Sequence, residues 1–337
     1  MARHAHPREG KVRYLVTGCS GFIGSALTER LLSHAHEVVG YDNFSTGREE
    51  FLLAARAHTR FRLVRADVLD AATLADSMRG VDFVYHLAAN ADVRFGPEHP
   101  RRDLEQNTIA THSVLEAMRQ NGVRRIAFAS SGSVYGEAPI VPTPEDAPFP
   151  IQTSLYGASK AAGEGLIAAY CAAFGLQAFI LRMVSILGER YTHGHVADFY
   201  RQLRRDPRVL QVLGNGRQRK SYLHVQDCID AMVVAVEHAR DAVNIFNIGS
   251  ESSCEVRESV GWICDSLGLT PRIEYGGGDR GWVGDNPVIV LDTSRIRALG
   301  WQPRLTIREG VLATLDYLRA NPAVLDAPTR RGHDHRA

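Results

Sequence analysis

The chain has 337 residues, with 39 basic and 38 acidic side chains and a formal net charge of +1. This length is sufficient for one large domain or two modest ones with a substantial buried core. The near-even charge balance excludes a global field that would attract nucleic acid or a membrane surface, so any anion site must be local.

The cysteines and the apolar runs indicate the compartment. The five cysteines are scattered without a Cys-x-x-Cys pair, which is typical of reduced thiols in a cytoplasmic protein. The N-terminus lacks the apolar stretch of a signal peptide, and no apolar run is long enough to span a bilayer. We therefore expect a cytoplasmic protein that binds neither nucleic acid nor a membrane, holds no metal, and has disordered ends at residues 1–11 and 326–337.

Strands and helices alternate along the first half of the chain. A β-branched run at residues 12–16, a helical pattern at 22–34 and an apolar run at 37–41 predict a strand–helix–strand unit. Further strands are predicted at 61–65, 83–86, 126–130 and 178–181, and further helices at 72–78, 104–121 and 157–174. This alternation predicts an α/β fold of the Rossmann type, with a doubly wound parallel sheet.

The pattern changes after residue 182, where glycine and proline become frequent and the predicted strands shorten, at 209–213, 243–248 and 272–275. A helical pattern at 225–238 has enough apolar residues to pack back on the first domain. We therefore predict a first domain of residues 12–183, with 224–240 packed on it, and a smaller C-terminal substrate-binding lobe of residues 184–223 and 241–325.

A glycine loop, Thr17-Gly18-Cys19-Ser20-Gly21-Phe22-Ile23-Gly24, follows the first predicted strand and begins the first helix. Glycines let backbone amides approach a pyrophosphate, and the helix N-terminus supplies partial positive charge to hold it. Asp42 ends the second predicted strand, where its carboxylate can accept hydrogen bonds from ribose hydroxyls and repels a 2′-phosphate. Together these features favour NAD over NADP. The alternative for Asp42 is a strand-capping turn with Asn43.

Two further groups predict a catalytic centre. Tyr156 and Lys160 stand four residues apart at the start of a predicted helix, so they share one face. An ammonium near a phenol favours the phenolate, so we expect Lys160 to lower the pKa of Tyr156 toward the range of a general base. Ser131 ends a predicted strand at the sheet edge where ligands bind, and its hydroxyl can bond the reacting oxygen and relay a proton to Tyr156.

These motifs resemble those of the extended short-chain dehydrogenase/reductases, specifically the NAD-dependent epimerase/dehydratase family, over about residues 12–320. Ser131, Tyr156 and Lys160 take the places of the family's catalytic residues, and Asn107 that of its helix asparagine. For Asp67, which the resemblance places at the adenine edge, a helix cap is the alternative. The implied NAD-binding residues are Gly18, Gly21, Phe22, Ile23, Gly24, Asp42, Asn43, Ser45, Thr46, Gly47, Asp67, Val68, Leu87, Ala88, Ala89, Tyr156 and Lys160.

The resemblance also implies a reaction. Tyr156, assisted by Ser131, would take the proton of a sugar 4-hydroxyl while hydride leaves C4 for nicotinamide; hydride return to the opposite face of the 4-keto sugar would regenerate NAD. Family dehydratases and decarboxylases carry an acid beside the serine, whereas this chain has Gly132 and Ser133, which favours a UDP-sugar 4-epimerase. The alternatives are a sugar-nucleotide dehydratase or ketoreductase and a non-catalytic dinucleotide sensor.

The substrate is expected to bind between the catalytic residues and the smaller lobe. By resemblance, Lys220 replaces a diphosphate-binding arginine, Arg280 meets the diphosphate and Asp285 the uridine ribose; a solvated loop and a glycine-rich turn are the alternatives. Ser185 stands where glucuronate epimerases tend to have threonine, which leaves glucose/galactose, glucuronate/galacturonate and N-acetyl sugars open. The substrate-binding candidates are Arg94, Ser131, Ser133, Tyr156, Ser185, Arg190, Lys220, Arg280 and Asp285.

Assembly is indicated by two helical patterns. Residues 104–118 and 157–174 carry more apolar residues than one buried helix face requires. This predicts a homodimer built on paired helices.

Overall fold

Seven parallel strands form the large sheet, in the order β11-β6-β5-β4-β1-β2-β3. The computed structural model describes residues 11–93, 96–148, 151–282 and 284–326. β4 is buried along its whole length, because helices cover both faces of a parallel sheet. The strands of this sheet are β1 (Arg13–Thr17), β2 (Glu37–Asp42), β3 (Phe61–Arg65), β4 (Phe83–His86), β5 (Arg125–Ser131), β6 (Gln177–Met183) and β11 (Val243–Ile248).

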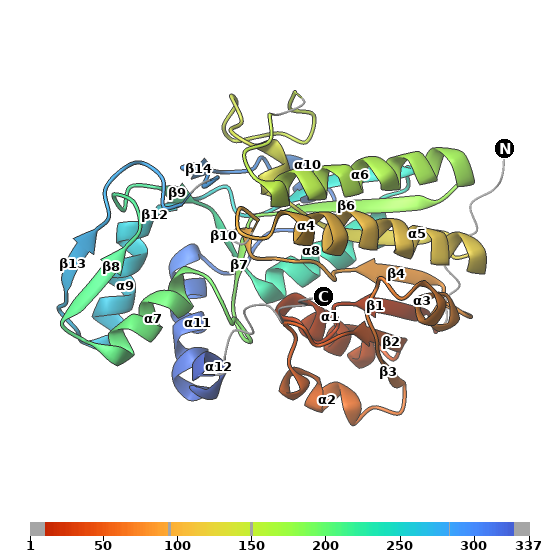
Figure 1. Cartoon of the computed structure of the whole chain (residues 1–337), viewed down its shortest axis with the longest axis horizontal. Coiled ribbons are helices and arrows are strands. Elements are labelled where there is room, and N and C mark those ends of the chain that lie inside the picture. The colour runs from red at the N-terminus through yellow and green to blue at the C-terminus, as the bar shows by residue number, and fades with distance from the viewer. Residues whose placement is uncertain (1–10, 94–95, 149–150, 283, 327–337) are drawn as a thin grey trace.

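Helices lie on both faces of the sheet (Figure 1). α5 packs between α3 and α6 on one face, whereas α1 packs against α8 on the other. Successive strand residues alternate between the two resulting cores: Phe128 and Ile180 lie in one, Phe179 and Leu181 in the other. The helical elements of this lobe are α1 (Phe22–Ser33), η1 (Glu49–Leu52), α2 (Leu53–Arg56), α3 (Ala71–Ser77), α4 (Pro100–Asp103), the π-helical η3 (Leu104–Ile109), α5 (Ala110–Asn121), η4 (Gly132–Tyr135), α6 (Leu155–Phe174), α8 (Val225–His238) and α10 (Ser294–Ala298).

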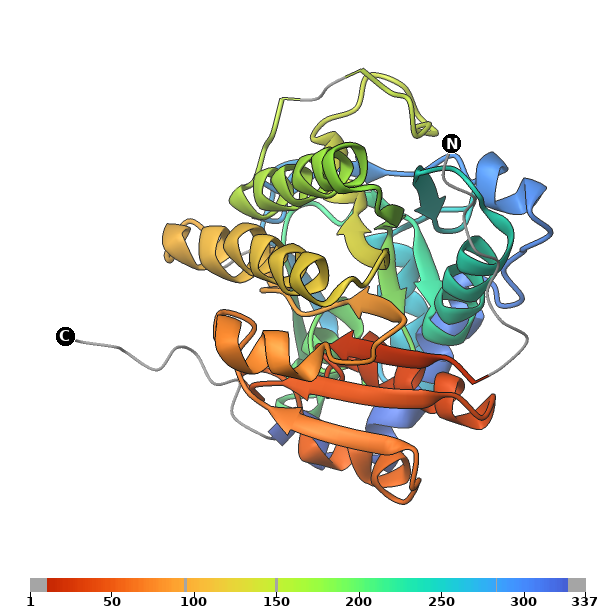
Figure 2. The same ribbon diagram turned by 90° about the vertical axis from the view of Figure 1, so that its right-hand side faces the viewer.

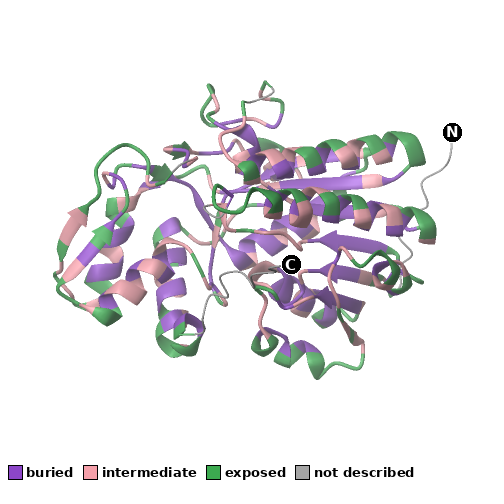
Figure 3. Cartoon of the chain, in the orientation of Figure 1, coloured by how far each residue is buried: buried purple, intermediate pink, exposed green. Residues whose placement is uncertain are grey.

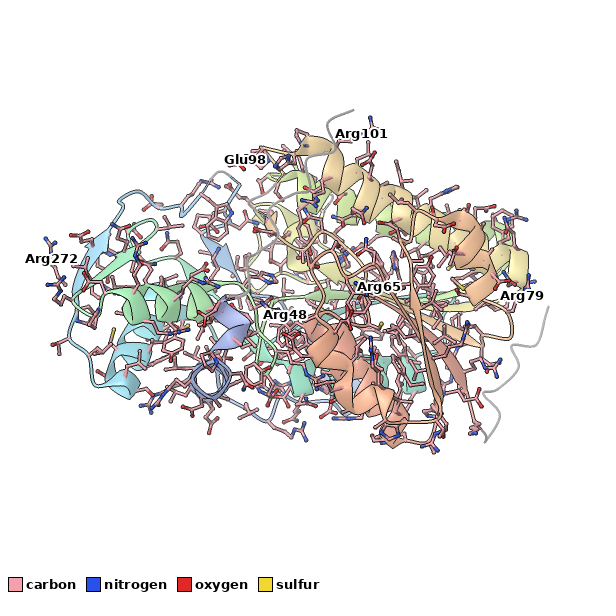
Figure 4. All side chains as sticks on the ribbon, turned by 60° about the horizontal axis from the view of Figure 1, so that its bottom comes forward. Arg48, Arg65, Arg79, Glu98, Arg101 and Arg272 are labelled. Carbon is pink, nitrogen blue, oxygen red and sulfur yellow. The ribbon has the colours of Figure 1, made fainter. Side chains whose placement is uncertain are left out.

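A smaller lobe lies beside the sheet, on the left in Figure 1, and has a third apolar core. Figure 4 shows Arg272 at the far end of this lobe and Arg79 at the far end of the larger one. α7, α9 and α11 contact one another, and β8 pairs with β13. The elements are β7 (Ser185–Leu187), α7 (His195–Arg205), β8 (Val209–Val212), β9 (Arg219–Lys220), β10 (Tyr222–His224), β12 (Cys254–Glu255), α9 (Val256–Leu267), β13 (Arg272–Tyr275), β14 (Val288–Ile289), α11 (Ile307–Ala320) and α12 (Ala323–Asp326).

The division between the lobes differs from the boundary expected from the sequence. β11 pairs with β6 over its whole length, so residues 243–248 belong to the large sheet and not to the smaller lobe. Ile296 and Trp301 are buried in the core that α8 also contributes to, so this later stretch packs on the larger lobe as well. Without β11, β6 would be an unpaired sheet edge, and the returning strand satisfies its backbone groups.

Burial follows the layers (Figure 3). The central strands of the large sheet are largely buried, the edge strand β3 is intermediate to exposed, and the outer faces of α5 and α6 are exposed. Figure 2 shows these two helices side by side. All five cysteines are free and buried. Within the described ranges, no helix has the length and apolar content that a bilayer crossing requires. Of the ends expected to be disordered, only Lys11 and Asp326 fall within the described residues.

Candidate active site

The glycine loop places an open helix N-terminus beside the end of β4. Gly18 has a φ of +72°, and a Cβ there would lie 2.8 Å from the backbone nitrogen of Ala88. A Cβ on Gly24 would lie 2.0 Å from the carbonyl oxygen of Gly18, so the helix packs directly on the loop. Gly21 is the N-cap of α1 and offers no side chain to the first helix amides. Backbone amides that no side chain caps fit a pyrophosphate.

Asp42 is tied to this loop. Its Oδ2 accepts a hydrogen bond from the backbone amide of Ser20, and its Oδ1 from that of Phe44, each at 2.8 Å. The Asp42 carboxylate therefore forms the turn that the alternative interpretation predicted, and it is also a fixed hydrogen-bond acceptor beside the glycine loop. The buried Ser20 hydroxyl, next to Gly47, has no hydrogen-bond partner among the described residues. An unpaired buried hydroxyl here fits a polar ligand.

Asp67 joins the ends of the second and third strands. Its Oδ2 accepts from the Asn43 amide at 2.7 Å, and its carbonyl accepts from the Tyr41 hydroxyl at 2.9 Å. Asp70, and not Asp67, caps α3 by accepting from the backbone amide of Thr73 at 3.2 Å. The helix-cap alternative for Asp67 is therefore wrong.

Thr17 fixes the end of β4 against the loop. Its Oγ1 accepts from the backbone amides of Leu87 and Ala88, each at 3.2 Å, and contacts His86 Nδ1 at 2.8 Å. Burial lowers the pKa of His86 to about 3, so this histidine is neutral. The segment predicted to line the cofactor, residues 87–89, thus begins at backbone amides held by Thr17, next to a neutral histidine.

Ser131 ends β5 and caps η4. Its Oγ accepts from the backbone amide of Ser133 at 3.1 Å and donates to the Ser133 hydroxyl at 3.2 Å. Between them Gly132 is buried: a Cβ there would lie 3.4 Å from Leu291 and 3.6 Å from Ile289, so a longer side chain in that direction would meet both. The turn presents two hydroxyls and no acid.

The structure brings Ser131, Tyr156 and Lys160 together. α6 begins one residue before Tyr156. Lys160 Nζ donates to the carbonyl of Ala129 on β5 at 2.8 Å and lies 5.9 Å from the centroid of the Tyr156 ring. A hydrogen bond with Ser131 links the phenol to the same strand. Strand β5 and helix α6 therefore assemble the predicted catalytic group.

The expected effect of Lys160 on the phenol is not found among the protein groups. Burial raises the pKa of Tyr156 to about 12; the bond with Ser131 lowers it, and the charge of Asp103 raises it. Lys160 is bonded to a backbone carbonyl, and burial lowers its own pKa to about 8, opposed by the charges of Glu164 and Asp103. Burial, and not Lys160, is therefore the main influence of the protein on the pKa of the phenol.

In the smaller lobe, Lys220 and Asp285 bind each other. Lys220 Nζ lies 2.7 Å from Asp285 Oδ1 in a buried ion pair and also donates to the carbonyl of Asn286. Asp285 Oδ2 accepts from the backbone amide of Gly281 at 2.9 Å. The sequence predicted separate contacts of these two side chains with a nucleotide; the fold instead engages each with the other.

Arg280, near the Lys220–Asp285 pair, is exposed. It donates to the carbonyl of Asp285 at 2.8 Å and forms an ion pair with Glu137, the second residue after η4. Asn286 donates to the carbonyl of Gly136. The loop of the smaller lobe therefore contacts residues 136–137, at the end of the turn that follows β5.

The remaining candidates for a sugar contact are spread out. Ser185 is exposed at the start of β7, two residues after the strand partner of Ser131. Arg190 has a φ of +68° and pairs with Glu29 of α1 at 2.5 Å, so its charge is engaged by the larger lobe. Arg94 lies outside the described residues.

Comparison with known proteins agrees with this geometry. Residues 14–249 match the NAD dependent epimerase/dehydratase family. The chain belongs to this family.

Three relatives illustrate the range of the epimerase/dehydratase family. The chain is 35% identical over 316 residues to a UDP-glucose 4-epimerase of Mycolicibacterium smegmatis, covering 91% of this chain and 99% of that protein. A UDP-glucuronic acid 4-epimerase of Bacillus cereus, solved with UDP-glucuronic acid and NAD, has a TM-score of 0.85 at 27% identity over 92% of this chain and 99% of its own. A dTDP-glucose 4,6-dehydratase of Streptomyces venezuelae, solved with NAD, has a TM-score of 0.86 at 28% identity over 94% of this chain and 99% of its own.

NAD is the cofactor of this family, and the residues at the glycine loop fit it. The uncapped amides of α1, the Asp42 carboxylate and the unpaired Ser20 hydroxyl offer the donors and acceptors that a dinucleotide uses. Ser45, Thr46 and Gly47 continue from Asn43, whose Oδ1 accepts from the Ser45 amide at 2.9 Å.

Sequence reasoning missed two buried groups around the family's catalytic residues. Glu164 stands four residues after Lys160; its carboxylate accepts from Ser130 on β5 and from Arg182 on β6 at 2.7 Å. The four-residue spacing from Lys160 could have indicated that Glu164 lies on the same helix face. Its partners Ser130 and Arg182, on two strands, could not be predicted from the sequence. The second group, around Asp103, is described below.

Proposed function

We propose that the chain is an NAD-dependent UDP-sugar 4-epimerase, which interconverts UDP-glucose and UDP-galactose or UDP-glucuronate and UDP-galacturonate through a 4-keto intermediate. The observation that carries this proposal is the turn after β5: Ser131 and Ser133 present hydroxyls, and buried Gly132 has Leu291 and Ile289 where an acidic side chain would extend. Elimination of water requires an additional acid or base at the sugar, and this turn supplies none.

The protein groups divide the proton chemistry as follows. Tyr156 accepts the proton of the sugar 4-hydroxyl, with Ser131 bonded to the phenol. Lys160, anchored on Ala129, supplies the positive charge near the ring. NAD held at the glycine loop and Asp42 would supply the hydride acceptor for C4, and its cationic nicotinamide would favour the phenolate that burial alone disfavours.

Arg280 is the residue that we propose to bind the diphosphate of the substrate, because its exposed guanidinium lies next to the turn that follows β5. Lys220 would contribute to nucleotide binding only indirectly: it binds Asp285, and Asp285 in turn positions the loop that carries Arg280. Relatives of both sugar classes resemble the chain, and Arg190, a candidate partner of a C6 carboxylate, is engaged by Glu29. We therefore propose either the glucose/galactose pair or the glucuronate/galacturonate pair as the sugar.

The decisive experiment is to incubate the purified protein with UDP-glucose and with UDP-glucuronate separately, without added reductant, and to resolve the C4 epimers. We expect conversion of one pair, with a fall of about 10²–10⁴ in kcat for Tyr156→Phe. Tyr170→Phe, on the same helix but bonded to Glu116 at 2.7 Å, is the matched control and should keep activity.

The other interpretations give different results. A 4-keto product that accumulates identifies the dehydratase alternative, which is the activity named for the relative from Streptomyces venezuelae. Consumption of added NAD(P)H identifies the ketoreductase alternative. A Tyr156→Phe variant that leaves every activity unchanged identifies a non-catalytic dinucleotide sensor.

A further inference from the structure

A buried carboxylate with no part in the proposed reaction lies next to the catalytic helix. Asp103, the last residue of α4, is 1% exposed. Its Oδ1 accepts from the side-chain amides of Asn90 at 2.8 Å and Asn107 at 3.3 Å. Its Oδ2 is buried without a hydrogen-bond partner within the described ranges. Such an unpaired oxygen is costly, which calls for a functional reason.

Asn107 connects this carboxylate to the catalytic helix. Its Nδ2 donates to Ser159 Oγ at 2.9 Å, and Ser159 stands between Tyr156 and Lys160 on α6. Its Oδ1 accepts from the backbone amide of Asn90 at 2.8 Å, in the loop that follows the cofactor segment of β4. Asn107 lies in the π-helical turn η3, a widened geometry that occurs frequently at functional sites.

The free oxygen of Asp103 lies at the start of α6. A Cβ on Gly96 would meet Asp103 Oδ2 at 2.8 Å and the Leu155 side chain at 3.2 Å, and Leu155 precedes Tyr156. A side chain at position 96 would therefore require displacement of Asp103 or Leu155.

The charge of Asp103 acts on both catalytic groups, because it raises the pKa of Tyr156 and that of Lys160. The other acid acting on Lys160 is Glu164, whose carboxylate forms a buried ion pair with Arg182. Around Asp103 itself, burial raises the pKa; Asn90, Lys160 and Arg102 lower it, and Asp92 raises it. Two neutral amides hold its carboxylate, so its charge is less compensated than that of Glu164.

We propose that Asp103 is a positioning residue of the catalytic centre: through Asn107 and Ser159 it holds α6 against the loop after β4, and its negative charge acts on the Tyr156–Lys160 pair. The proposal rests on the proposed function for the roles of Tyr156 and Lys160. Its hydrogen bonds are independent of that function.

The test is the titration of the Tyr156 phenol in the NAD-loaded protein, followed by ultraviolet difference absorbance with Tyr156→Phe as the blank. Asp103→Asn removes the charge with little change in shape, so the midpoint should fall by about one pH unit. Both limbs of the pH profile of kcat/KM should move to lower pH, since the pKa of Lys160 falls in the same direction.

The matched control is Glu105→Gln, which removes the same charge two residues further on. Glu105 pairs at 2.5 Å with Arg101, which is 86% exposed and projects from the outside of α4 in Figure 4. This variant should leave the phenol midpoint unchanged.

The phenol titration needs no turnover, so it separates the two proposals. If the wild-type protein converts no UDP-sugar but the midpoint falls in Asp103→Asn, the epimerase proposal fails and the role of Asp103 stands. Thermal unfolding checks that the variants fold, and Asp103→Ser, which keeps an acceptor for Asn90, replaces Asp103→Asn if the latter does not. A midpoint that stays in place in the folded variant, or that moves equally in Glu105→Gln, overturns the proposal.

Discussion

Lys160, which we propose as a catalytic residue, has a buried ammonium. Burial disfavours the charged form and lowers the pKa of Lys160 to about 8, so the side chain loses its proton at a lower pH than a free lysine does. If the ammonium is needed beside the phenol, kcat/KM should decrease as the pH rises through about 8. The pH profile of the wild-type protein measures this.

A lysine-to-arginine exchange identifies the group behind that decrease. Arginine stays charged throughout the range, so Lys160→Arg should lose the alkaline decrease even though its lower geometric fit reduces the rate. An alkaline limb that persists at the same pH in this variant would show that another group titrates.

Residue identities in the site were predictable where the chemistry is local in sequence. Tyr156 and Lys160 stand one helical turn apart, and Ser131 ends a strand, so spacing alone predicted that the fold would bring them together. The pairing of Lys220 with Asp285 joins residues 65 apart, on elements whose contact depends on the packing of the smaller lobe. No local pattern encodes such a contact.

At the scale of elements, a buried ionic cluster joins β5 and α6, the two elements that carry the proposed catalytic residues. Glu164 of α6 binds Arg182 of β6 and Ser130 of β5, with side chains 9% and 13% exposed for the ion pair. Glu164→Ala would leave a buried guanidinium unpaired. We expect a loss of about 3–5 kcal/mol in the free energy of unfolding, measured with denaturant.

The control for this cluster is a surface pair on the neighbouring helix. Glu116 and Arg119 lie three residues apart on α5 with side chains 28% and 43% exposed. Glu116→Ala should cost no more than about 1 kcal/mol. Equal losses for the two variants would contradict a structural role of the buried cluster.

Element bounds were predictable where hydrophobic periodicity was clear. The strands at 61–65 and 83–86 and the helix at 225–238 have the bounds that the sequence indicated. The expected helix at 104–121 begins instead with a π-helical turn. In this turn Asn107 forms hydrogen bonds with Ser159 and Asn90, and hydrophobic periodicity cannot predict such polar contacts. β11 was recognised as a strand but placed in the wrong lobe, since its partner is set by the sheet edge.

At the scale of the molecule, the two lobes meet at the turn that follows β5. Arg280 of the smaller lobe pairs with Glu137, and their side chains are 44% and 50% exposed. A diphosphate would compete with this carboxylate for the guanidinium. Glu137→Gln should therefore tighten the binding of UDP several-fold with little effect on stability, because an exposed pair contributes little to folding.

Titration calorimetry with UDP measures this effect. Arg280→Gln should weaken the binding of UDP. In the Arg280→Gln background, Glu137→Gln should no longer tighten binding, because the guanidinium with which Glu137 competes is absent. A Glu137→Gln variant that binds UDP more weakly would mean that the carboxylate helps to place Arg280 instead of competing for it.

The outer surface of the larger lobe leaves apolar side chains uncovered near paired helices. Leu104 and Ile109 of η3 are 52% and 43% exposed, and Leu155 and Phe174 at the two ends of α6 are 43% and 41% exposed. Figures 1 and 2 show α5 and α6 side by side. A second copy that pairs these helices with its own would cover this surface around a twofold axis, and the homodimer stays our prediction.

Light scattering at micromolar concentration should give twice the mass of the chain, and Ile109→Asp should give the single mass, because a charge at the centre of an apolar interface cannot be hydrated there. Leu53→Asp is the control: Leu53 is 68% exposed on α2, on a different part of the lobe, and should not change the mass. Because α6 carries Tyr156 and Lys160, a dimer on this face would also support the catalytic helix from outside. The monomeric Ile109→Asp variant should then show a lower kcat together with a lower unfolding temperature, whereas a wild-type protein that is already monomeric contradicts the prediction.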